Sequence, residues 1–315
     1  MQHTRRVFLL LTQILCAWRG LPAMALVLVL WSGLASASDL HPLRHGEGRL
    51  WRIERGDATP SHIMGTMHVS DPRVRDLPAP IREAFEGSEQ AAFELLMTPE
   101  ERQAAAQMGS CDCSSGKPLS KLVDRATFKR AVELAGRYGI PEKAVDRMQP
   151  GALAWLFQTP PDEIRRRADG DLFLDLYLIQ WAYDLGKRVV ALEKLEEQIS
   201  ALESAPETDQ ADILREVIDR LEEDPDAHEQ LIEDYLVGDM TRVFREMEED
   251  LANDPGARAF KEAMLDDRNR TMVKRMIPLL QRGSAFVAVG AAHLPGEEGM
   301  LYLLEQEGYR VTRVY

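Results

Sequence analysis

Two apolar segments near opposite ends of the chain lead into the same Gly-x-x-His spacing. Ile63-Met64 precedes Gly65-Thr66-Met67-His68, and Phe286-Val287-Ala288-Val289 precedes Gly290-Ala291-Ala292-His293. Glycine at such a point permits a tight turn or a close approach of the backbone to a ligand. A residue just beyond a strand end lies at the crevice where α/β sheets bind ligands. The spacing therefore predicts that both ends of the chain supply a strand and a histidine to one site, although a lone buried histidine satisfied by hydrogen bonds is the simpler interpretation of either motif.

The remaining patterns place helices between these two ends. Strand-like runs cover residues 50–53, 62–64, 90–95, 187–192, 284–289 and 309–315, and helical spacing of apolar residues covers 117–138, 171–185 and 257–280. A short helix at 80–85 makes a strand–helix–strand unit, which favours a parallel pair, and a further helix is expected to start near Pro295. The acidic stretch 193–249 is expected to be helical with a solvated face. The predicted fold class is α/β: a central mixed sheet built from both ends of the chain and flanked by helices, with a long helical insertion at about 97–280, in one domain spanning 38–315.

The first 37 residues are predicted to be a signal peptide. Arg5-Arg6 precede two apolar runs, and the second run ends at Ala35-Ser36-Ala37, a small-x-small pattern with the cut expected before Ser38. Thr4-Arg5-Arg6-Val7-Phe8-Leu9 resembles a twin-arginine export signal. We therefore expect a periplasmic or secreted protein. If the signal is not cleaved, the two runs form a tilted inner-membrane anchor, and this segment is the only expected contact with a membrane.

The charge of the chain argues against one class of partner. The formal net charge is −14, and the first 37 residues hold three arginines and no acid, so the remainder is more acidic still. Nucleic-acid binding normally needs a basic surface, so no nucleic-acid partner is expected. Cys111 and Cys113 would close only a small, poorly shaped disulfide ring. They are interpreted as a tolerated surface pair, and neither the oligomeric state nor the redox state of the pair follows from the sequence.

An acid within an apolar run provides a third candidate for the site. Glu94 lies in Ala91-Ala92-Phe93-Glu94-Leu95, and burying a carboxylate without compensation is costly. Two imidazoles and one carboxylate are a common ligand set for a catalytic metal ion, and zinc, manganese or cobalt suits such donors. Glu193 follows a similar run, Val189-Val190-Ala191-Leu192, but stabilising the start of the next helix explains it equally well.

Arg268-Asn269 is the last candidate feature. Arg268 would bind a substrate carboxylate or stabilise an oxyanion, whereas the alternative is an ion pair with Asp266, Asp267 or Glu94. Asn269, Gly65, Gly290 and Glu193 are predicted to contribute to substrate binding. The other histidines, including His62 and His228, are interpreted as surface residues.

With these motifs, the sequence resembles the TraB/GumN family, which includes the animal Tiki proteins. The resemblance covers the chain from about Leu50 onward, and the closing Gly-x-x-His block is its most specific part. Met67 departs from the branched aliphatic residue that is common there, and the polar His62 precedes the first motif. The matching blocks are Leu50-Trp51-Arg52-Ile53, Met64–Val69, Phe93-Glu94-Leu95, Gly170-Asp171, Gly186–Val189, Leu192-Glu193, Glu197-Gln198, Arg268-Asn269, Val289–Glu297 and Gly308–Val311.

The resemblance implies a fold similar to erythromycin-esterase-like and ChaN-like haem-uptake proteins. It also implies a metal-dependent peptidase activity, with His68, Glu94 and His293 as site residues. These three residues are predicted to hold the metal, or Glu94 to serve as a base beside it, and Arg268 is predicted to be a catalytic residue that stabilises developing negative charge. The leading hypothesis is a periplasmic metal-dependent hydrolase acting on a peptide or small molecule. Two alternatives stay open: a non-catalytic binding protein for a peptide signal or haem, and an accessory factor of envelope polysaccharide export.

Overall fold

The computed structural model describes residues 43–96, 117–203, 210–242, 244, 258 and 261–315. The expected signal segment and the pair Cys111 and Cys113 lie outside these residues. The chain divides into two compact units: a helical one that includes residues 97–161 and 205–225, and one around the β-sheet that includes 28–96, 162–204 and 226–315. Within the described ranges, no helix has the length and apolar character needed to cross a bilayer.

The sheet is mixed and draws its strands from both ends of the chain, as the sequence predicts. Its spatial order is β4-β3-β5-β2-β1-β6. The first four strands in that order run parallel, whereas β1 is antiparallel to both of its neighbours, β2 and β6. The strands are β1 Leu50–Glu54, β2 Ser61–Thr66, β3 Gln90–Phe93, β4 Arg188–Ala191, β5 Ala285–Gly290 and β6 Arg310–Arg313.

The expected parallel pairing of β2 with β3 is corrected in one respect. The two strands are parallel and joined through α3 (Ala79–Glu86), but β5 lies between them and pairs with both. The apolar residues of β5 are almost fully buried, from Ala285 to Val289. A strand covered on both faces belongs at the centre of a sheet, so this strand from the C-terminal end of the chain separates β2 from β3.

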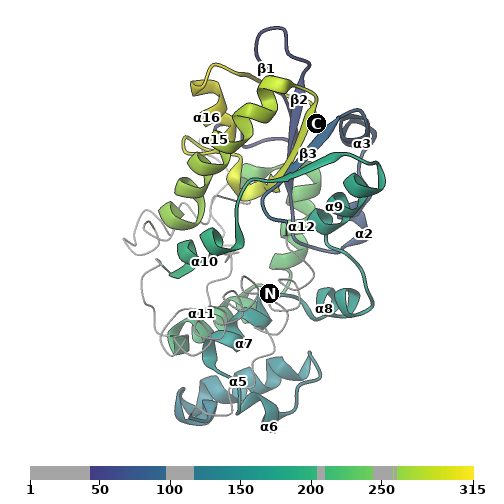
Figure 1. Ribbon diagram of the computed structural model, residues 1–315. Helices are drawn as coiled ribbons and strands as arrows, with labels where there is room; N and C mark the ends of the chain where they lie inside the picture. Colours follow the sequence, from purple (N-terminus) through teal and green to yellow (C-terminus); the bar gives the residue numbers. More distant parts are fainter. Residues whose placement is uncertain (1–42, 97–116, 204–209, 243, 245–257, 259–260) are drawn as a thin grey trace, which may run out of the picture. The chain divides into compact units, whose positions relative to one another are not determined.

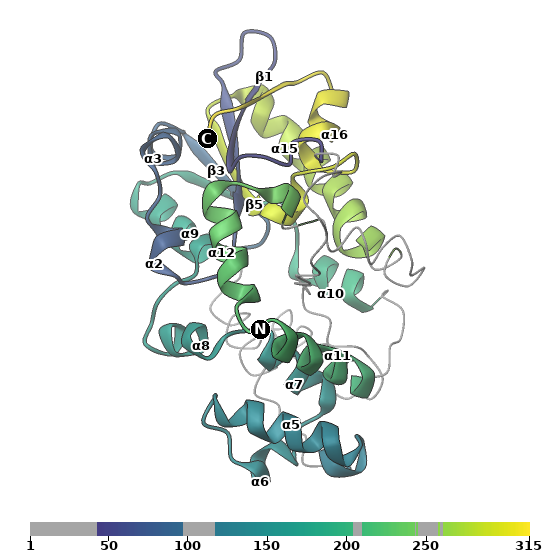
Figure 2. The same ribbon diagram turned by 180° about the vertical axis from the view of Figure 1, so that it is seen from behind.

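Helices cover both faces of the sheet, as Figures 1 and 2 show from opposite sides. Alternate residues of β5 point to opposite faces, so Phe286 and Ala288 join one buried cluster while Val287 and Val289 join the other. The first cluster packs beneath α2 (Pro72–Arg75), α3, α9 (Leu174–Asp184) and α12 (Ala227–Val237), and the second beneath α15 (Asp267–Arg282) and α16 (Met300–Gln306).

Several helix boundaries differ from the expected ones for local reasons. The helix expected from Pro295 begins instead at Met300, since a short 3-10 turn, η3 (Ala291–His293), and Gly296 in the left-handed region (φ +91°) intervene. The helix expected over 257–280 is, in its described part, a π-helical turn η2 (Glu262–Asp266) followed by α15. The acidic stretch contains α10 (Leu195–Glu203), α11 (Gln210–Glu223) and α12, and α12 ends at Gly238 with φ +80°.

The helical unit has a core of its own. The helix expected over 117–138 is shortened because Asp124 caps α5 (Arg125–Gly136), accepting from the N–H groups of Ala126 and Thr127. The unit also contains η1 (Leu119–Lys121), α6 (Glu142–Val145), α7 (Pro150–Phe157) and α11. Its buried residues include Leu119, Ala131, Leu153, Phe157, Leu214 and Ile218.

Candidate functional site

The carboxyl ends of the four parallel strands meet at one edge of the sheet. In the register, Phe93 of β3 lies beside Ala191 of β4 and Ala288 of β5, and Thr66 of β2 lies beside Gly290. Each strand is followed within three residues by one candidate: Glu193 after β4, Glu94 after β3, His293 after β5 and His68 after β2. The two Gly-x-x-His motifs therefore lie at the ends of adjacent strands, at the same edge of the sheet.

Glu94 and His293 face each other across Gly290. The N–H of Gly290 donates to Oε1 of Glu94, and the same oxygen lies 3.6 Å from Nε2 of His293. A Cβ atom on Gly290 would lie 3.0 Å from this carboxylate oxygen. A side chain here would push the carboxylate away by a few tenths of an ångström, whereas the φ of −51° is open to any residue.

Asn269 on α15 determines which nitrogen of His293 carries the proton. Nδ2 of Asn269 donates to the carbonyl oxygen of Glu298 at 2.9 Å, so its Oδ1 is the atom that faces Nδ1 of His293 at 2.6 Å. An amide oxygen only accepts hydrogen bonds, so the proton must be on Nδ1. In the neutral ring, the lone pair of Nε2 then points toward the Glu94 carboxylate, a tautomer set by a supporting hydrogen bond as in many metal-ligating histidines.

Arg268 holds Glu94 from the other side. Its Nη2 donates to Oε2 of Glu94 at 3.1 Å and to Oε2 of Glu193 at 2.6 Å, while Nη1 donates to the carbonyl oxygen of Met264. Both Arg268 and Glu193 are buried. The guanidinium is thus engaged with two carboxylates of the protein. Of the ion-pair partners considered from the sequence, Glu94 is the one that the structure shows.

The protonation of this pair follows from its surroundings. Burial alone would raise the pKa of Glu94, but the positive charges of His293, Arg268 and His68 and the N–H of Gly290 outweigh it and lower the pKa to about 2. Burial lowers the pKa of His293 to about 4, against the opposing effect of Glu94. Near neutral pH, an ionised carboxylate therefore faces a neutral imidazole.

His68 has a different environment. Its side chain is 52% exposed, and its Nε2 lies 3.5 Å from Oδ1 of Asp175 on α9. The negative charge of Asp175 raises the pKa of His68 to about 9, with a smaller contribution from Glu94. Sequence reasoning missed Asp175, although it is an acid in the apolar run Phe173-Leu174-Asp175-Leu176, the same signal that identified Glu94.

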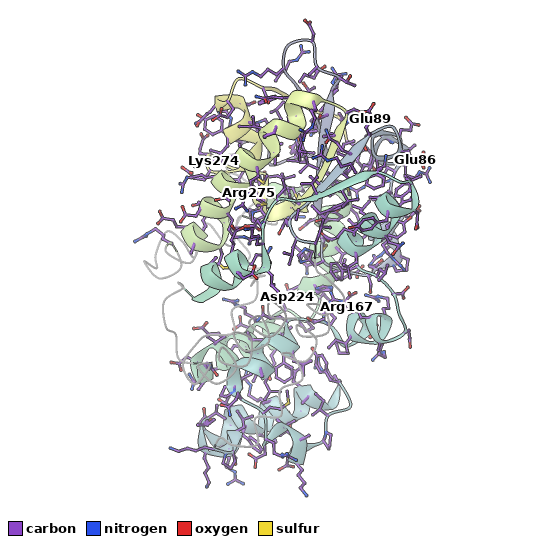
Figure 3. All side chains as sticks on the ribbon, in the orientation of Figure 1. Glu86, Glu89, Arg167, Asp224, Lys274 and Arg275 are labelled. Carbon is purple, nitrogen blue, oxygen red and sulfur yellow. The ribbon has the colours of Figure 1, made fainter. Side chains whose placement is uncertain are left out.

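The segment after His68 is fixed by α8 (Pro161–Ala168). Glu163, whose side chain is 1% exposed, accepts hydrogen bonds from the N–H and hydroxyl of Ser70 and from Arg166 and Arg167. Arg167, labelled in Figure 3, also donates to the carbonyl oxygen of His68. Sequence reasoning missed Glu163 too, because its neighbours along the helix are mostly polar and nothing local indicates that it is buried.

The four residues predicted to bind substrate all lie at this edge of the sheet. The side chains of Glu193 and Asn269 contact protein groups, and a Cβ on Gly65 would lie 3.1 Å from Cα of Ala291. Gly65 therefore allows β2 to pack closely against the second motif, and Gly290 makes room for Glu94. Their assignment to substrate binding stays a prediction.

Two of the three predicted metal ligands have donor atoms at a spacing that suits a divalent ion. In the described part of the chain, no group of three or more His, Cys, Asp or Glu side chains is arranged to hold one ion. The pair Glu94 and His293 nevertheless has suitable spacing, because atoms bound at about 2.0–2.2 Å to a tetrahedral zinc ion lie roughly 3.3–3.6 Å apart. His68 lies at the end of the adjacent strand with its ring turned to Asp175, so two of the three predicted ligands are already together.

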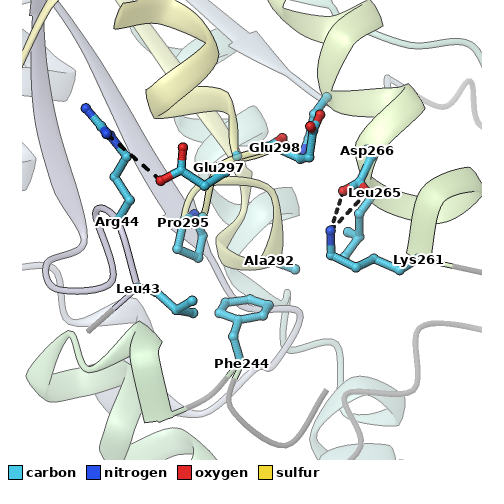
Figure 4. Close-up of a pocket in the computed structure, with 13 residues that line it drawn as sticks. Leu43, Arg44, Phe244, Lys261, Leu265, Asp266, Ala292, Pro295, Glu297 and Glu298 are labelled. Carbon is cyan, nitrogen blue, oxygen red and sulfur yellow. Dashed lines mark hydrogen bonds and ion pairs between the residues drawn. The ribbon is translucent and has the colours of Figure 1, made fainter. Parts of the chain in front are cut away.

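A cavity of about 370 Å³ lies beside the second Gly-x-x-His motif, and Asn269 and Ala292 form part of its wall (Figure 4). Its wall combines apolar side chains with charged groups that are paired with one another. Lys261 forms an ion pair with Asp266 at 2.7 Å, and Arg44 lies 3.9 Å from Glu297. The apolar wall consists of Leu43, Phe244, Leu265, Ala292 and Pro295. A cavity of this size and mixed lining is typical of small-ligand sites.

The chain is similar in sequence to several proteins that are named as metalloproteases. "Metalloprotease TIKI2" of Danio rerio is 26% identical over 83% of this chain and 60% of its own length, and "Metalloprotease TIKI1" of Homo sapiens is 26% identical over 83% and 61%. A "Metalloprotease TIKI homolog" of Nematostella vectensis is 24% identical over 89% and 70%. The chain spans about 60% of the length of most of these relatives. No solved structure matches.

The family model described as TraB/PrgY/gumN matches residues 49–313. This range includes both Gly-x-x-His motifs, Glu94, Arg268 and every strand of the sheet. The chain therefore belongs to the TraB/PrgY/gumN family.

Proposed function

We propose that this chain is an exported metal-dependent peptidase whose site is built on Glu94, His293 and His68. The observation that supports the proposal is the pairing of Glu94 with His293. Two hydrogen-bond acceptors face each other at 3.6 Å, while Asn269 holds the only proton of the imidazole on its far side. Such an arrangement is unfavourable unless a cation, a proton or a bridging water molecule joins the two atoms. The metalloprotease names of the relatives favour the cation.

Each residue of the site has a distinct part in this proposal. A bound divalent ion would polarise the scissile carbonyl and lower the pKa of a water molecule. Glu94 and His293 would hold it, and the half-exposed His68 at the next strand end would complete the ligand set. Arg268 and the N–H of Gly290 hold Glu94 in place. Arg268 is therefore assigned a positioning role, since its guanidinium is engaged with two carboxylates.

The proposed substrate is a peptide. The cavity beside Ala292 would accept part of it, because five apolar side chains line a space large enough for one or two amino-acid side chains. A substitution that fills this space, Ala292→Leu, is expected to lower the rate of peptide cleavage without changing metal affinity. Equal cleavage rates in the variant and the parent would exclude the cavity as part of the substrate site.

The central experiment measures metal content and cleavage together. The purified protein is analysed for zinc, manganese and cobalt, then incubated with a defined peptide mixture and followed by mass spectrometry. We expect about one divalent ion per chain and cleavage that falls more than about 100-fold in His293→Ala and Glu94→Gln, since changes outside the ligand set already cost 10–100-fold. His62→Ala is the matched control, because His62 lies near the start of β2, whereas the first motif and the site residues lie at the carboxyl end of that strand.

Two outcomes would contradict this function. One is a protein that binds no divalent ion at micromolar concentrations. The other is cleavage that persists in the His293→Ala and Glu94→Gln variants. A protein without turnover that shows a Soret shift on addition of haem, lost in His293→Ala, would favour the non-catalytic binding alternative.

A further inference from the structure

Asp175 is a charged residue outside both motifs whose side chain lies beside the ring of His68. Its Oδ1 accepts a hydrogen bond from Oγ1 of Thr66 at 2.6 Å and lies 3.5 Å from Nε2 of His68. Its Oδ2 is buried and has no hydrogen-bond partner among the described residues. The carboxylate thus accepts a hydrogen bond from the last residue of β2 and lies beside the histidine of the first Gly-x-x-His motif.

The start of α9 is docked onto this motif by further contacts. The N–H of Leu174 donates to the carbonyl oxygen of Val69, and the ring of Phe173 lies 5.4 Å from the ring of His68. An acid in the first turn of a helix often serves only to stabilise the helix dipole. For Asp175 that explanation is incomplete, because its hydrogen-bond donor is Thr66 of the strand and no backbone N–H of α9 is bonded to it.

We propose that Asp175 is the positioning residue of His68, orienting its ring through Nε2 and leaving Nδ1 as the nitrogen available to a ligand. The two motifs are then built alike. Oδ1 of Asn269 lies 2.6 Å from Nδ1 of His293, and Oδ1 of Asp175 lies 3.5 Å from Nε2 of His68. A carboxylate or amide oxygen behind a histidine fixes both its tautomer and its orientation. The inference rests on the proposed metal-binding function, because a metal ion that displaces the proton from Nδ1 would give that nitrogen its use.

The test measures zinc affinity by titration against a chromophoric chelator, with no need for a substrate. We expect Asp175→Ala to weaken zinc binding 10–100-fold. The loss of zinc affinity in Asp175→Asn should be smaller than in Asp175→Ala, because an amide oxygen can still accept from Nε2–H. Asp184→Asn is the matched control, since Asp184 is an exposed carboxylate at the end of the same helix; its affinity should equal that of the parent.

A double-mutant cycle shows whether Asp175 acts through His68. In a His68→Ala background, Asp175→Ala should cause no further loss of zinc affinity, because the ring that it orients is gone. A loss of the same size in both backgrounds would overturn the inference, and so would full affinity in Asp175→Ala. In the zinc-loaded protein, ¹⁵N spectra should show His68 protonated at Nε2; protonation at Nδ1 would also overturn it.

The outcome also separates this inference from the proposed function. If the parent protein binds no zinc, manganese or cobalt, the proposed function fails. If the parent binds zinc and Asp175→Ala binds it equally well, the proposed function stands and only the role of Asp175 is rejected.

Discussion

Oδ1 of Asn269 lies 2.6 Å from Nδ1 of His293, and the amide nitrogen of the same asparagine is bonded to the carbonyl oxygen of Glu298. Through these two contacts, a residue of α15 sets the orientation of a histidine that follows β5. The second Gly-x-x-His motif is therefore part of a larger hydrogen-bonded unit that includes α15.

Replacing Asn269 should weaken metal binding without unfolding the protein. Asn269→Ala removes the acceptor for Nδ1–H, so the ring of His293 loses its fixed tautomer, and we expect a 10–100-fold loss of zinc affinity. Asn269→Asp retains an oxygen at the same place, so its loss of zinc affinity should be smaller than that of Asn269→Ala. Calorimetric titration gives the affinities, and circular dichroism checks the fold. Unchanged affinity in Asn269→Ala would show that the contact does not orient a ligand.

Gly290→Ala should disturb Glu94 directly. The added Cβ would lie 3.0 Å from the carboxylate oxygen that Gly290 itself binds, so the carboxylate must move. We expect at least about a tenfold loss of zinc affinity. Gly136→Ala is the matched control, because a Cβ there meets no atom within 4 Å and alanine is the better helix former. Equal affinities in the two variants would contradict this role of Gly290.

Arg268 and Arg270 provide a matched pair for stability. Arg268→Leu leaves the carboxylates of Glu94 and Glu193 buried without their cation, and we expect a loss of about 3–5 kcal/mol in the free energy of unfolding. Arg270 also pairs with two acids, Asp267 and Glu298, but its side chain is 41% exposed. Its replacement by leucine should cost less than about 1 kcal/mol. Urea denaturation measures both, and similar losses would mean that burial does not distinguish the two ion pairs.

His228 should make stability depend on pH. The structure corrects its interpretation as a surface residue: Nε2 is buried and has no hydrogen-bond partner in the described residues. Burial lowers the pKa of His228 from its ordinary 6.5. The charged groups that face it are Glu163 and Arg166 on α8, Asp71 before α2, and Glu229 on its own helix.

The sign of the effect follows from this lowered pKa. Below about pH 6.5 the unfolded chain binds a proton that the folded chain does not, so the free energy of unfolding should decrease as the pH falls from 6.5 toward the folded-state pKa. Above pH 6.5 the contribution is constant. Urea denaturation at several pH values should give a steeper decline for the parent than for His228→Gln. Identical slopes would contradict the assignment.

The sequence by itself predicted the strands of the sheet and the candidate residues His68, Glu94 and His293 at its edge. Apolar runs that end in Gly-x-x-His indicated β2 and β5, and an acid in an apolar run indicated Glu94, because the cost of burying polar groups leaves a local trace in the pattern. These signals placed His293 and Glu94 together in expectation, and the structure brings the two side chains within 3.6 Å of each other.

Only the tertiary structure decided how these residues are used. The fold places β5 between β2 and β3, pairs Arg268 with Glu94 and Glu193, and puts Asn269 and Asp175 beside the two histidines. All of these depend on contacts between residues 24 to 224 positions apart. Such contacts are set by strand order and helix packing, which no periodicity within a short segment encodes. The spacing of residues along the chain therefore predicted which groups are present, whereas the direction in which each donor and acceptor points was fixed by the fold.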